Sequence, residues 1–220
     1  MDYHFQWRPV LRSLPEMLAG TLVTIEIAGV AMLLGTIIAI FLALCKRSGK
    51  KYLALPADAW IETARNTPAL FQIYTLYFGL GSWGLQLSSF VALLLGITFN
   101  NAGYLAETFR GGFEAVPETQ IKAARSLGLG PAQAMRYVVI PQMLRAVFHA
   151  MTNQMVWSIL MSSMGVIVGL TTDLTGVTQQ LNVVTYRTFE YFSVAACLYY
   201  LVSKALTSSA RVLAWRLFRY

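Results

Sequence analysis

Polar side chains that recur at helical spacing inside otherwise apolar stretches are the residues of this sequence that could do chemistry. In a helix, positions about three to four and seven to eight residues apart share one face, so such a row lines a hydrophilic path or bonds to a neighbouring helix. Both interpretations stay open here. The two rows are Asn100, Tyr104 and Glu107, at i, i+4 and i+7, and Gln154, Ser158 and Ser162, at i, i+4 and i+8, with Asn153 beside the second row.

Ionisable residues within or beside apolar stretches add two further candidates for such a path. Glu26 is the most isolated acid in the chain, and it either faces a path for a polar solute or lies near lipid headgroups. Asp58, Glu62 and Arg65 fall at i, i+4 and i+7, which favours a local ion-pair stripe, with Arg65 also a candidate for the path. Pro68 should kink this helix and free backbone carbonyls, as in the broken helices that line transport paths.

No arrangement typical of an enzyme accompanies these residues. His4 and His149 are isolated, without the spacing of metal ligands, and no nucleophile has a base at suitable spacing. Cys45 closes one apolar run and Cys197 lies inside another, so both thiols are expected to behave as small hydrophobes. We therefore predict no catalytic residue, no metal site and no cofactor bound by this chain.

The elements that must position these residues are membrane-spanning helices. Of the 220 residues, 56% are hydrophobic and 12% are charged, and the mean hydropathy is +0.55. Stretches without a charged residue reach the length of about 20 apolar residues that one span needs, and a soluble chain of this size could not bury several such helices. We predict a single all-α integral membrane domain over residues 1–220 with five spans, roughly Leu18–Cys45, Ala57–Leu80, Ser88–Phe109, Pro141–Leu170 and Phe189–Leu213.

Lysine and arginine are distributed unevenly about these spans. Thirteen of the 17 lie in the loop Lys46–Lys51, the segment Arg110–Arg145 and the C-terminal tail, Lys204–Arg219. Because basic loops remain in the cytoplasm, we predict that the N-terminus lies outside and the C-terminus lies in the cytoplasm. The net charge of +7 then follows from topology and from contact with membrane lipid, without a nucleic-acid partner. The N-terminus carries Asp2 and no basic region, so we expect no cleavable signal peptide.

The long loop over residues 111–140 carries helix signals of its own. Pro117 suits the start of a short helix, and Gly128 and Gly130 suit its end. A helix of about two turns is marginal alone in water, so we expect it to dock into a groove on a partner. A second helical stretch, Ala132–Val139, leads to the foot of the fourth span.

Four short motifs follow one another along the chain in a familiar order. Ala123-Ala124, Gly128 and Val138–Pro141 have the spacing of a cytoplasmic coupling loop called the EAA loop. Ile61–Pro68 and Asn100–Gly112 resemble the signatures of a second and a third span, and Pro141-Gln142 with Asn153-Gln154 resembles the start of a fourth. Together they cover roughly residues 16–170 and resemble the permease subunits of ATP-driven (ABC) importers for polar amino acids.

That resemblance implies a location in the bacterial cytoplasmic (inner) membrane, a mechanism and a set of partners. The segment Gln120–Gly128 would transmit motion from cytoplasmic ATPase subunits, which hold ATP and Mg²⁺, to an alternating-access pathway. A second permease subunit, homologous or identical, and a periplasmic or extracellular amino-acid-binding protein would complete the transporter. The stretch Tyr3–Gly20 is most similar to glutamate/aspartate permeases, so acidic amino acids are the first expectation, ahead of glutamine or basic ones. The coupling residues would be Gln120, Lys122, Ala123, Ala124, Arg125 and Gly128.

The sequence departs from the family pattern at three places. Lys122 stands where a glutamate is usual, Thr119 where a glycine is usual, and Leu160–Ser163 replaces a Lys-Asp-Thr-Ser string. Two other classes of membrane protein are alternatives to the permease. An ion-coupled secondary transporter predicts inverted repeats, and a membrane enzyme needs a nucleophile, base or metal cluster. The sequence has neither feature.

Overall fold

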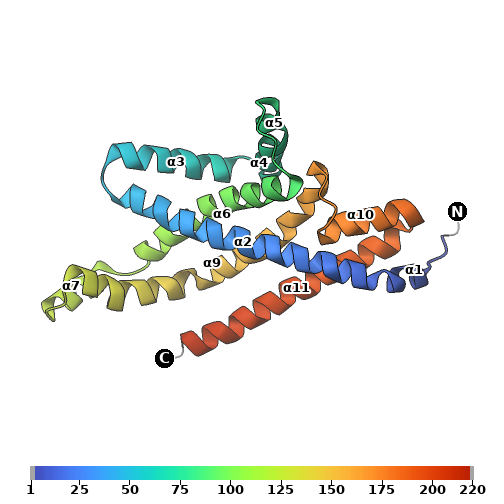
Figure 1. Cartoon of the computed structure of the whole chain (residues 1–220). Coiled ribbons are helices and arrows are strands. Elements are labelled where there is room, and N and C mark those ends of the chain that lie inside the picture. Colours follow the sequence, from blue (N-terminus) through green and yellow to red (C-terminus); the bar gives the residue numbers. More distant parts are fainter. Residues whose placement is uncertain (1–2, 219–220) are drawn as a thin grey trace.

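The computed structural model describes residues 3–218, and these residues form helices without a strand (Figure 1). The prediction of an all-α fold is confirmed. Asp2 and Arg219, used above for the N-terminal charge and the C-terminal tail, lie outside the described residues. Two of the elements, η1 and η2, are π-helical and η3 is 3₁₀-helical. The elements are α1 (Trp7–Arg12), α2 (Leu14–Arg47), α3 (Lys51–Asn66), α4 (Ala69–Tyr74), η1 (Thr75–Gly79), α5 (Leu80–Ser82), α6 (Ser89–Glu114), α7 (Glu118–Ser126), α8 (Pro131–Ala134), η2 (Met135–Val139), α9 (Ile140–Met161), η3 (Ser162–Val168), α10 (Leu174–Thr185) and α11 (Thr188–Leu217).

Three helical stretches of the described chain are long and apolar enough to cross a membrane: Leu14–Arg47, Ser89–Glu114 and Pro131–Val168. They overlap the first, third and fourth predicted spans. At a rise of about 1.5 Å per residue, α2 is about 51 Å long and exceeds a hydrocarbon core of about 30 Å. The fifth predicted segment is helical within α11, and the number of crossings stays a prediction.

The second predicted span is broken. A single helix with a kink was expected over 57–80, but α3 ends at Asn66, and both Thr67 (φ −120°, ψ 144°) and Pro68 (φ −62°, ψ 134°) are extended. Proline has no N–H to donate and its ring forces the preceding residue out of the helical region, so the helix stops rather than bends. The chain resumes as α4, η1 and α5, and it turns back at Gly84 (φ +86°) toward α6.

Pro141 does not interrupt its helix. The sequence suggested a short stretch over 132–139 that ends at this proline, whereas α8, η2, α9 and η3 follow one another without a gap from Pro131 to Val168. A proline ring clashes with the carbonyl four residues before it, and the wider turn of a π-helix relieves such a clash. The π-helical segment Met135–Val139 ends two residues before Pro141 and includes Tyr137, the residue four positions before this proline, so it gives that room.

The helix α10 lies between the fourth and fifth predicted spans, where no helix was predicted. Both carboxylate oxygens of Asp173 accept hydrogen bonds at its start, from the backbone N–H of Gly176 and of Thr175 (3.1 Å each). Burial raises the pKa of the Asp173 carboxyl above its ordinary value. The backbone N–H of Leu174 donates to Thr24 Oγ1 (3.2 Å), which ties α10 to α2. An aspartate directly before apolar residues at helical spacing, here Leu174, Val177 and Leu181, is an N-cap signal that could have predicted this helix.

Small residues let α2 and α6 approach closely. Ala39 and Ala43 of α2 are buried, and Ala39 packs in one core cluster with Ala102 and Leu105 of α6. A Cβ added at Gly35 would lie 2.7 Å from Asn101 Cβ, nearer than real side chains approach. Gly35, Ala39 and Ala43 recur at every fourth position, a pattern that favours close helix packing. The close contact is present, and its partner is α6 of the same chain.

Gly35→Ala is expected to destabilise the protein although alanine favours helices. Overpacking of a tight helix contact costs about 1–3 kcal/mol, which outweighs the gain in helix propensity of about 0.5–1 kcal/mol. Gly29→Ala on the same helix is the matched control, because a Cβ there has no neighbour within 4 Å. The thermal unfolding midpoint of the purified protein should fall for Gly35→Ala and stay equal or rise for Gly29→Ala. Equal midpoints for the two variants would contradict the close contact.

Candidate functional site

Side-chain amides satisfy the carbonyls that the break between α3 and α4 leaves without helical partners. Gln72 Nε2 donates to the carbonyls of Ala64 (3.0 Å) and Thr67 (3.1 Å). Asn100 Nδ2 donates to the same Ala64 carbonyl and to Gln72 Oε1 (3.2 Å each). Both amides are buried. Because unsatisfied backbone groups cost several kcal/mol in an apolar medium, these bonds allow an extended segment inside the bundle. Gln72 was not among the predicted site residues, although a lone glutamine one turn after Pro68 was a signal.

The broken helix borders a cavity of about 750 Å³ between α6 and α9. Five of the nine predicted path residues line it, and they supply one guanidinium, three amides and one phenol. Trp157, Met161 and Met164 give it an apolar side. A cavity of this size, apolar in part and with a few convergent polar groups, is typical of a small-molecule site. The five residues are Arg65, Asn100, Tyr104, Asn153 and Gln154.

A buried hydrogen-bonded cluster lies directly behind this cavity. Gln154 Nε2 donates to Asn101 Oδ1 (2.8 Å), and Asn101 Nδ2 donates to Ser158 Oγ (2.9 Å). Asn101 and Ser158 are fully buried. Ser158, predicted for the path, therefore joins α9 to α6, and it holds Gln154 in place through Asn101. Asn101 was not among the predicted site residues, because it lies one position away from Asn100 and so falls on a different face of the helix.

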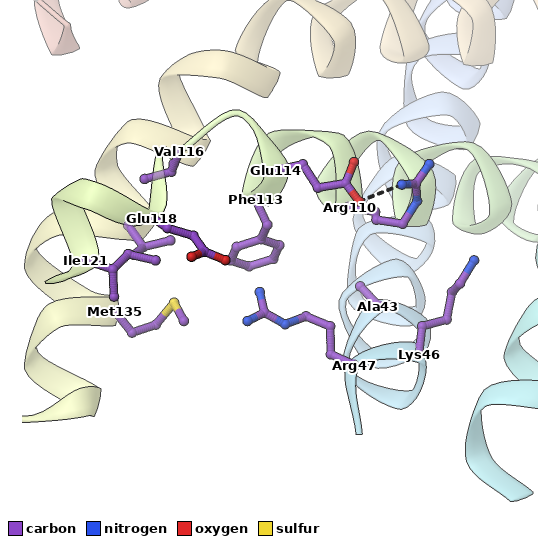
Figure 2. Close-up of a pocket in the computed structure, with 11 residues that line it drawn as sticks. Ala43, Lys46, Arg47, Arg110, Phe113, Glu114, Val116, Glu118, Ile121 and Met135 are labelled. Atoms are coloured by element: carbon purple, nitrogen blue, oxygen red, sulfur yellow. Dashed lines mark hydrogen bonds and ion pairs between the residues drawn. The ribbon is translucent and has the colours of Figure 1, made fainter. Parts of the chain in front are cut away.

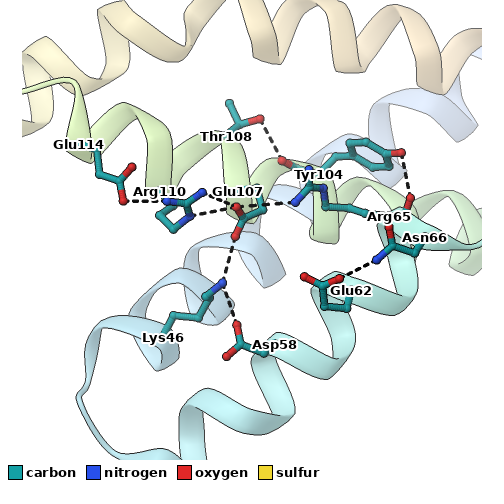
Figure 3. A network of polar contacts seen from close by, with 10 residues as sticks. All are labelled: Lys46, Asp58, Glu62, Arg65, Asn66, Tyr104, Glu107, Thr108, Arg110 and Glu114. Carbon is teal, nitrogen blue, oxygen red and sulfur yellow. Dashed lines mark hydrogen bonds and ion pairs between the residues drawn. The ribbon is translucent and has the colours of Figure 1, made fainter.

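Ion pairs around Glu107 hold the other end of the cavity (Figure 3). The Glu107 carboxylate accepts hydrogen bonds from Lys46 Nζ (3.1 Å) and Arg110 Nη2 (2.7 Å), and Arg65 Nη1 lies 3.7 Å away. Lys46 also pairs with Asp58 (2.7 Å), so α2, α3 and α6 meet in one network. Glu107 itself does not line the cavity. Its carboxylate instead positions Arg65, whose guanidinium also lies 5.9 Å from the centre of the Tyr104 ring.

The ion-pair stripe expected along α3 does not form. Asp58 pairs with Lys46 of α2, Arg65 pairs with Glu107 of α6, and Glu62 accepts a hydrogen bond from Asn66 (2.6 Å). Asp58 and Arg65, which spacing placed on one face, therefore pair with residues of neighbouring helices instead of with each other. Arg65 is consequently held at the cavity by a residue distant in the sequence.

Two predicted path residues lie elsewhere. Glu26 is exposed on α2 and is not among the residues that line the cavity. Ser162 is fully buried at the start of η3, and its hydroxyl donates to the carbonyl of Ile159, three residues earlier at the end of α9 (2.8 Å). Neither residue reaches the cavity.

The short helix α7 begins and ends where its sequence signals lie. Pro117 precedes its first residue, and Gly128 (φ +87°) follows its last turn. The N–H of Leu129 donates to the carbonyl of Ala124 (3.2 Å) and that of Gly128 to Arg125 (3.0 Å), the two bonds of a Schellman motif. The glycine is required there because a side chain disfavours a positive φ.

The residues predicted to meet a partner on α7 face two ways. Ala124 is buried against its own chain, whereas Gln120, Lys122, Ala123, Arg125 and Gly128 are exposed. Lys122 Nζ lies 3.3 Å from Glu118 on the same helix, so its charge is balanced locally. Leu127 was not predicted, yet it is 82% exposed at the end of α7 and offers the largest apolar surface beside these residues.

A groove of about 530 Å³ separates α7 from the ends of α2 and α6 (Figure 2). Phe113, Ile121 and Met135 line it, and Arg47 extends across it from α2, its guanidinium 4.8 Å from the centre of the Phe113 ring. The helix α7 is thus not packed directly on these two helix ends, and it lies at one extremity of the molecule (Figure 1).

Known proteins of the same kind match nearly the whole chain. A family described as the binding-protein-dependent transport system inner membrane component matches residues 31–219. The octopine transport system permease protein OccM of Rhizobium radiobacter is 31% identical, over 98% of this chain and 90% of its own. A putative glutamine transport system permease protein GlnP of Rickettsia bellii is 30% identical, over 98% of each chain. A solved structure described as an amino acid ABC transporter with histidines has a TM-score of 0.91 at 31% identity, over 97% of this chain and all of the other.

Long apolar helices packed around a polar cavity are the framework of a membrane permease. More specifically, the chain belongs to the family of binding-protein-dependent transport system inner membrane components. It is a permease subunit of an ABC importer and has no catalytic role, because members of this family are transport subunits.

Proposed function

We propose that this subunit carries a polar amino acid along an alternating-access pathway of which the cavity between α6 and α9 is a part. The observation that carries this proposal is the convergence of Arg65 and the amides of Asn100, Asn153 and Gln154 beside a broken helix. These groups match the donors and acceptors of a zwitterion. The relatives described as octopine and glutamine permeases, and the neighbour described as an amino acid transporter, support the same class of cargo.

Acidic amino acids are the cargo that the charge of the cavity favours. Arg65 is the single charged residue among those that line it, and its guanidinium can pair with a carboxylate in a bidentate manner. The amides can donate to a second carboxylate. A basic side chain would meet no acid among the lining residues, and burying its charge unpaired would be costly.

The proposed orientation places α7 in the cytoplasm. The N-terminus lies at the α10 end of the molecule and the end of α11 lies toward the α7 end, as an outside N-terminus and an inside C-terminus require (Figure 1). Lys46, Arg47 and Arg110 gather near α7 (Figure 2), which supports the cytoplasmic side for this end. An external binding protein would then deliver cargo at the α10 end.

The proposed coupling runs through α7. An ATPase subunit, which holds ATP and Mg²⁺, would receive the exposed face of Gln120–Gly128, with Leu127 as its apolar anchor. The groove beside α7 gives this helix room to move toward α2 and α6. Pairing with a second permease subunit, identical or homologous, would complete the pathway.

Arg65→Gln is expected to lower ATP-driven uptake of glutamate or aspartate by about tenfold or more. Losing one hydrogen bond to a charged group costs about 1.5–3 kcal/mol, and each 1.4 kcal/mol is about a factor of ten. The measurement is uptake of labelled glutamate, aspartate, glutamine and arginine into proteoliposomes that hold the permease, its ATPase and the binding protein. Arg145→Gln is the matched control, because Arg145 is exposed on α9 and does not line the cavity.

Arg65→Lys tests the positive charge apart from the guanidinium geometry. It keeps a cation near Glu107 and should retain part of the uptake. Unchanged uptake in Arg65→Gln would contradict the cavity assignment. Preference of the wild type for glutamine or arginine would reject acidic cargo and leave the permease assignment intact.

A further inference from the structure

A second cavity, of about 470 Å³, lies against the other side of the broken helix. Its walls come from Ile38 of α2, Trp60 of α3, Phe71 of α4, and Leu95 and Phe99 of α6. None of the residues that line it is charged. A charged ligand is therefore excluded by the cost of desolvation, whereas a hydrocarbon body would fit these walls. Its volume lies within the range of about 300–1,000 Å³ that is typical of ligand pockets.

One buried hydroxyl in this cavity has no partner in the described part of the chain. Thr98 is 4% exposed, and its Oγ1 has no hydrogen-bond partner within residues 3–218. The neighbouring threonines differ, because Thr63 and Thr67 each donate to the carbonyl four residues before them (2.7 Å). A buried hydroxyl without a partner is unfavourable, so Thr98 is suited to bond with an oxygen that enters the cavity.

The two cavities share a wall. Thr67, in the extended segment, lines both of them. Gln72 lines the second cavity and accepts a hydrogen bond from Asn100, which lines the transport cavity (3.2 Å). A molecule in the second cavity would therefore touch the two residues that fix the position of the break.

We propose that this second cavity binds a neutral amphiphile from the membrane, a hydrocarbon body with one hydroxyl or carbonyl oxygen that bonds to Thr98. Its occupancy biases the conformation of the break between α3 and α4, and thereby the rate of transport. The binding step does not depend on which solute the transporter carries. Failure of the cargo proposal and failure of this one are therefore distinguishable.

Trp60 supplies a reporter for the test, because bromine quenches indole fluorescence at contact. The purified permease–ATPase complex in nanodiscs is titrated with a terminally brominated long-chain alcohol and, separately, with the bromoalkane of equal chain length. The alcohol should quench at a concentration about threefold to tenfold lower, the equivalent of one net hydrogen bond. Trp60→Phe should remove this quenching component, which identifies the reporter.

Thr98→Val keeps the shape of the side chain and removes the hydroxyl, so the two probes should then quench equally. Thr98→Ser should restore the preference for the alcohol. The alcohol should also change the ATP-driven uptake rate of the wild type at concentrations that leave Thr98→Val unaffected. Equal quenching by both probes in the wild type, or a preference that survives in Thr98→Val, would overturn the proposal. Equal quenching by a phospholipid with brominated acyl chains would likewise overturn it, because bulk lipid would then be the occupant.

Discussion

Replacing Leu127 with aspartate is expected to lower ATP-driven uptake by about thirtyfold while the chain still inserts in the membrane. Leu127 is 82% exposed at the end of α7, so little of its apolar surface is buried within its own chain. A side chain that anchors an interface contributes about 2 kcal/mol or more, which corresponds to a factor of about thirty. The charge introduced at this position would in addition oppose burial against a partner. Uptake and ATPase co-purification should fall together.

Leu55→Asp is the matched control for this prediction. Leu55 is 65% exposed on α3, next to the basic loop at the same end of the proposed orientation, and it lies outside α7. Its replacement should leave the amount of co-purified ATPase unchanged. If Leu127→Asp retains the ATPase and the uptake rate of the wild type, α7 does not carry the coupling.

Gln72→Leu should destabilise the protein by about 2–5 kcal/mol, because each buried polar group left without a partner costs about 1–3 kcal/mol. The substitution removes the donor to the carbonyl of Thr67 and the acceptor for the Asn100 amide. The Ala64 carbonyl keeps one bond, from Asn100 (3.2 Å). The expected result is a thermal unfolding midpoint of the purified complex lower by several degrees, together with reduced uptake, since Asn100 would keep only one of the two bonds that fix it at the cavity.

Thr63→Val is the matched control, because it also replaces a polar side chain near the break with an apolar one. Its hydroxyl is exposed and bonds only to the carbonyl of Ala59 in its own helix (2.7 Å). Surface substitutions of this sort usually change stability by less than about 0.5 kcal/mol. A midpoint for Gln72→Leu no lower than that for Thr63→Val would show that the break does not depend on these amides.

The parts of the fold that the sequence predicts correctly are those with local causes. The all-helical class follows from composition, and the bounds of α7 follow from Pro117 and Gly128, whose effects act within one turn. The close contact of α2 also has a local cause, because the small residues Gly35 and Ala39 on one face permit close packing with any partner helix. That partner is α6.

The parts that it misses depend on partners far apart in the sequence. Helical spacing placed Asp58 and Arg65 in one stripe, but Lys46 and Glu107 come from other helices and pair with them instead. Spacing likewise could not distinguish Asn100, which lines the cavity, from Ser162, whose hydroxyl bonds to the backbone three residues before it. Pro68 was expected only to kink the helix. The helix breaks completely because side chains distant in the sequence bond to the freed carbonyls, and the sequence alone does not reveal these bonds.

The function was indicated by motifs rather than by physical chemistry. Composition and charge identify only a membrane protein whose basic residues lie mainly on one side of the membrane. The four ordered motifs then indicate a subunit of an importer. The geometry then adds what the motifs lack: Arg65 and the amides meet in one cavity, and α7 extends beyond the packed helices with Leu127 uncovered.

The most direct test of this account is uptake of a labelled amino acid into proteoliposomes that contain this chain, its ATPase and its binding protein. We expect uptake that requires ATP on the α7 side and the binding protein on the α10 side, and that persists without an ion gradient. Uptake driven by a proton or sodium gradient in the absence of ATP would contradict it.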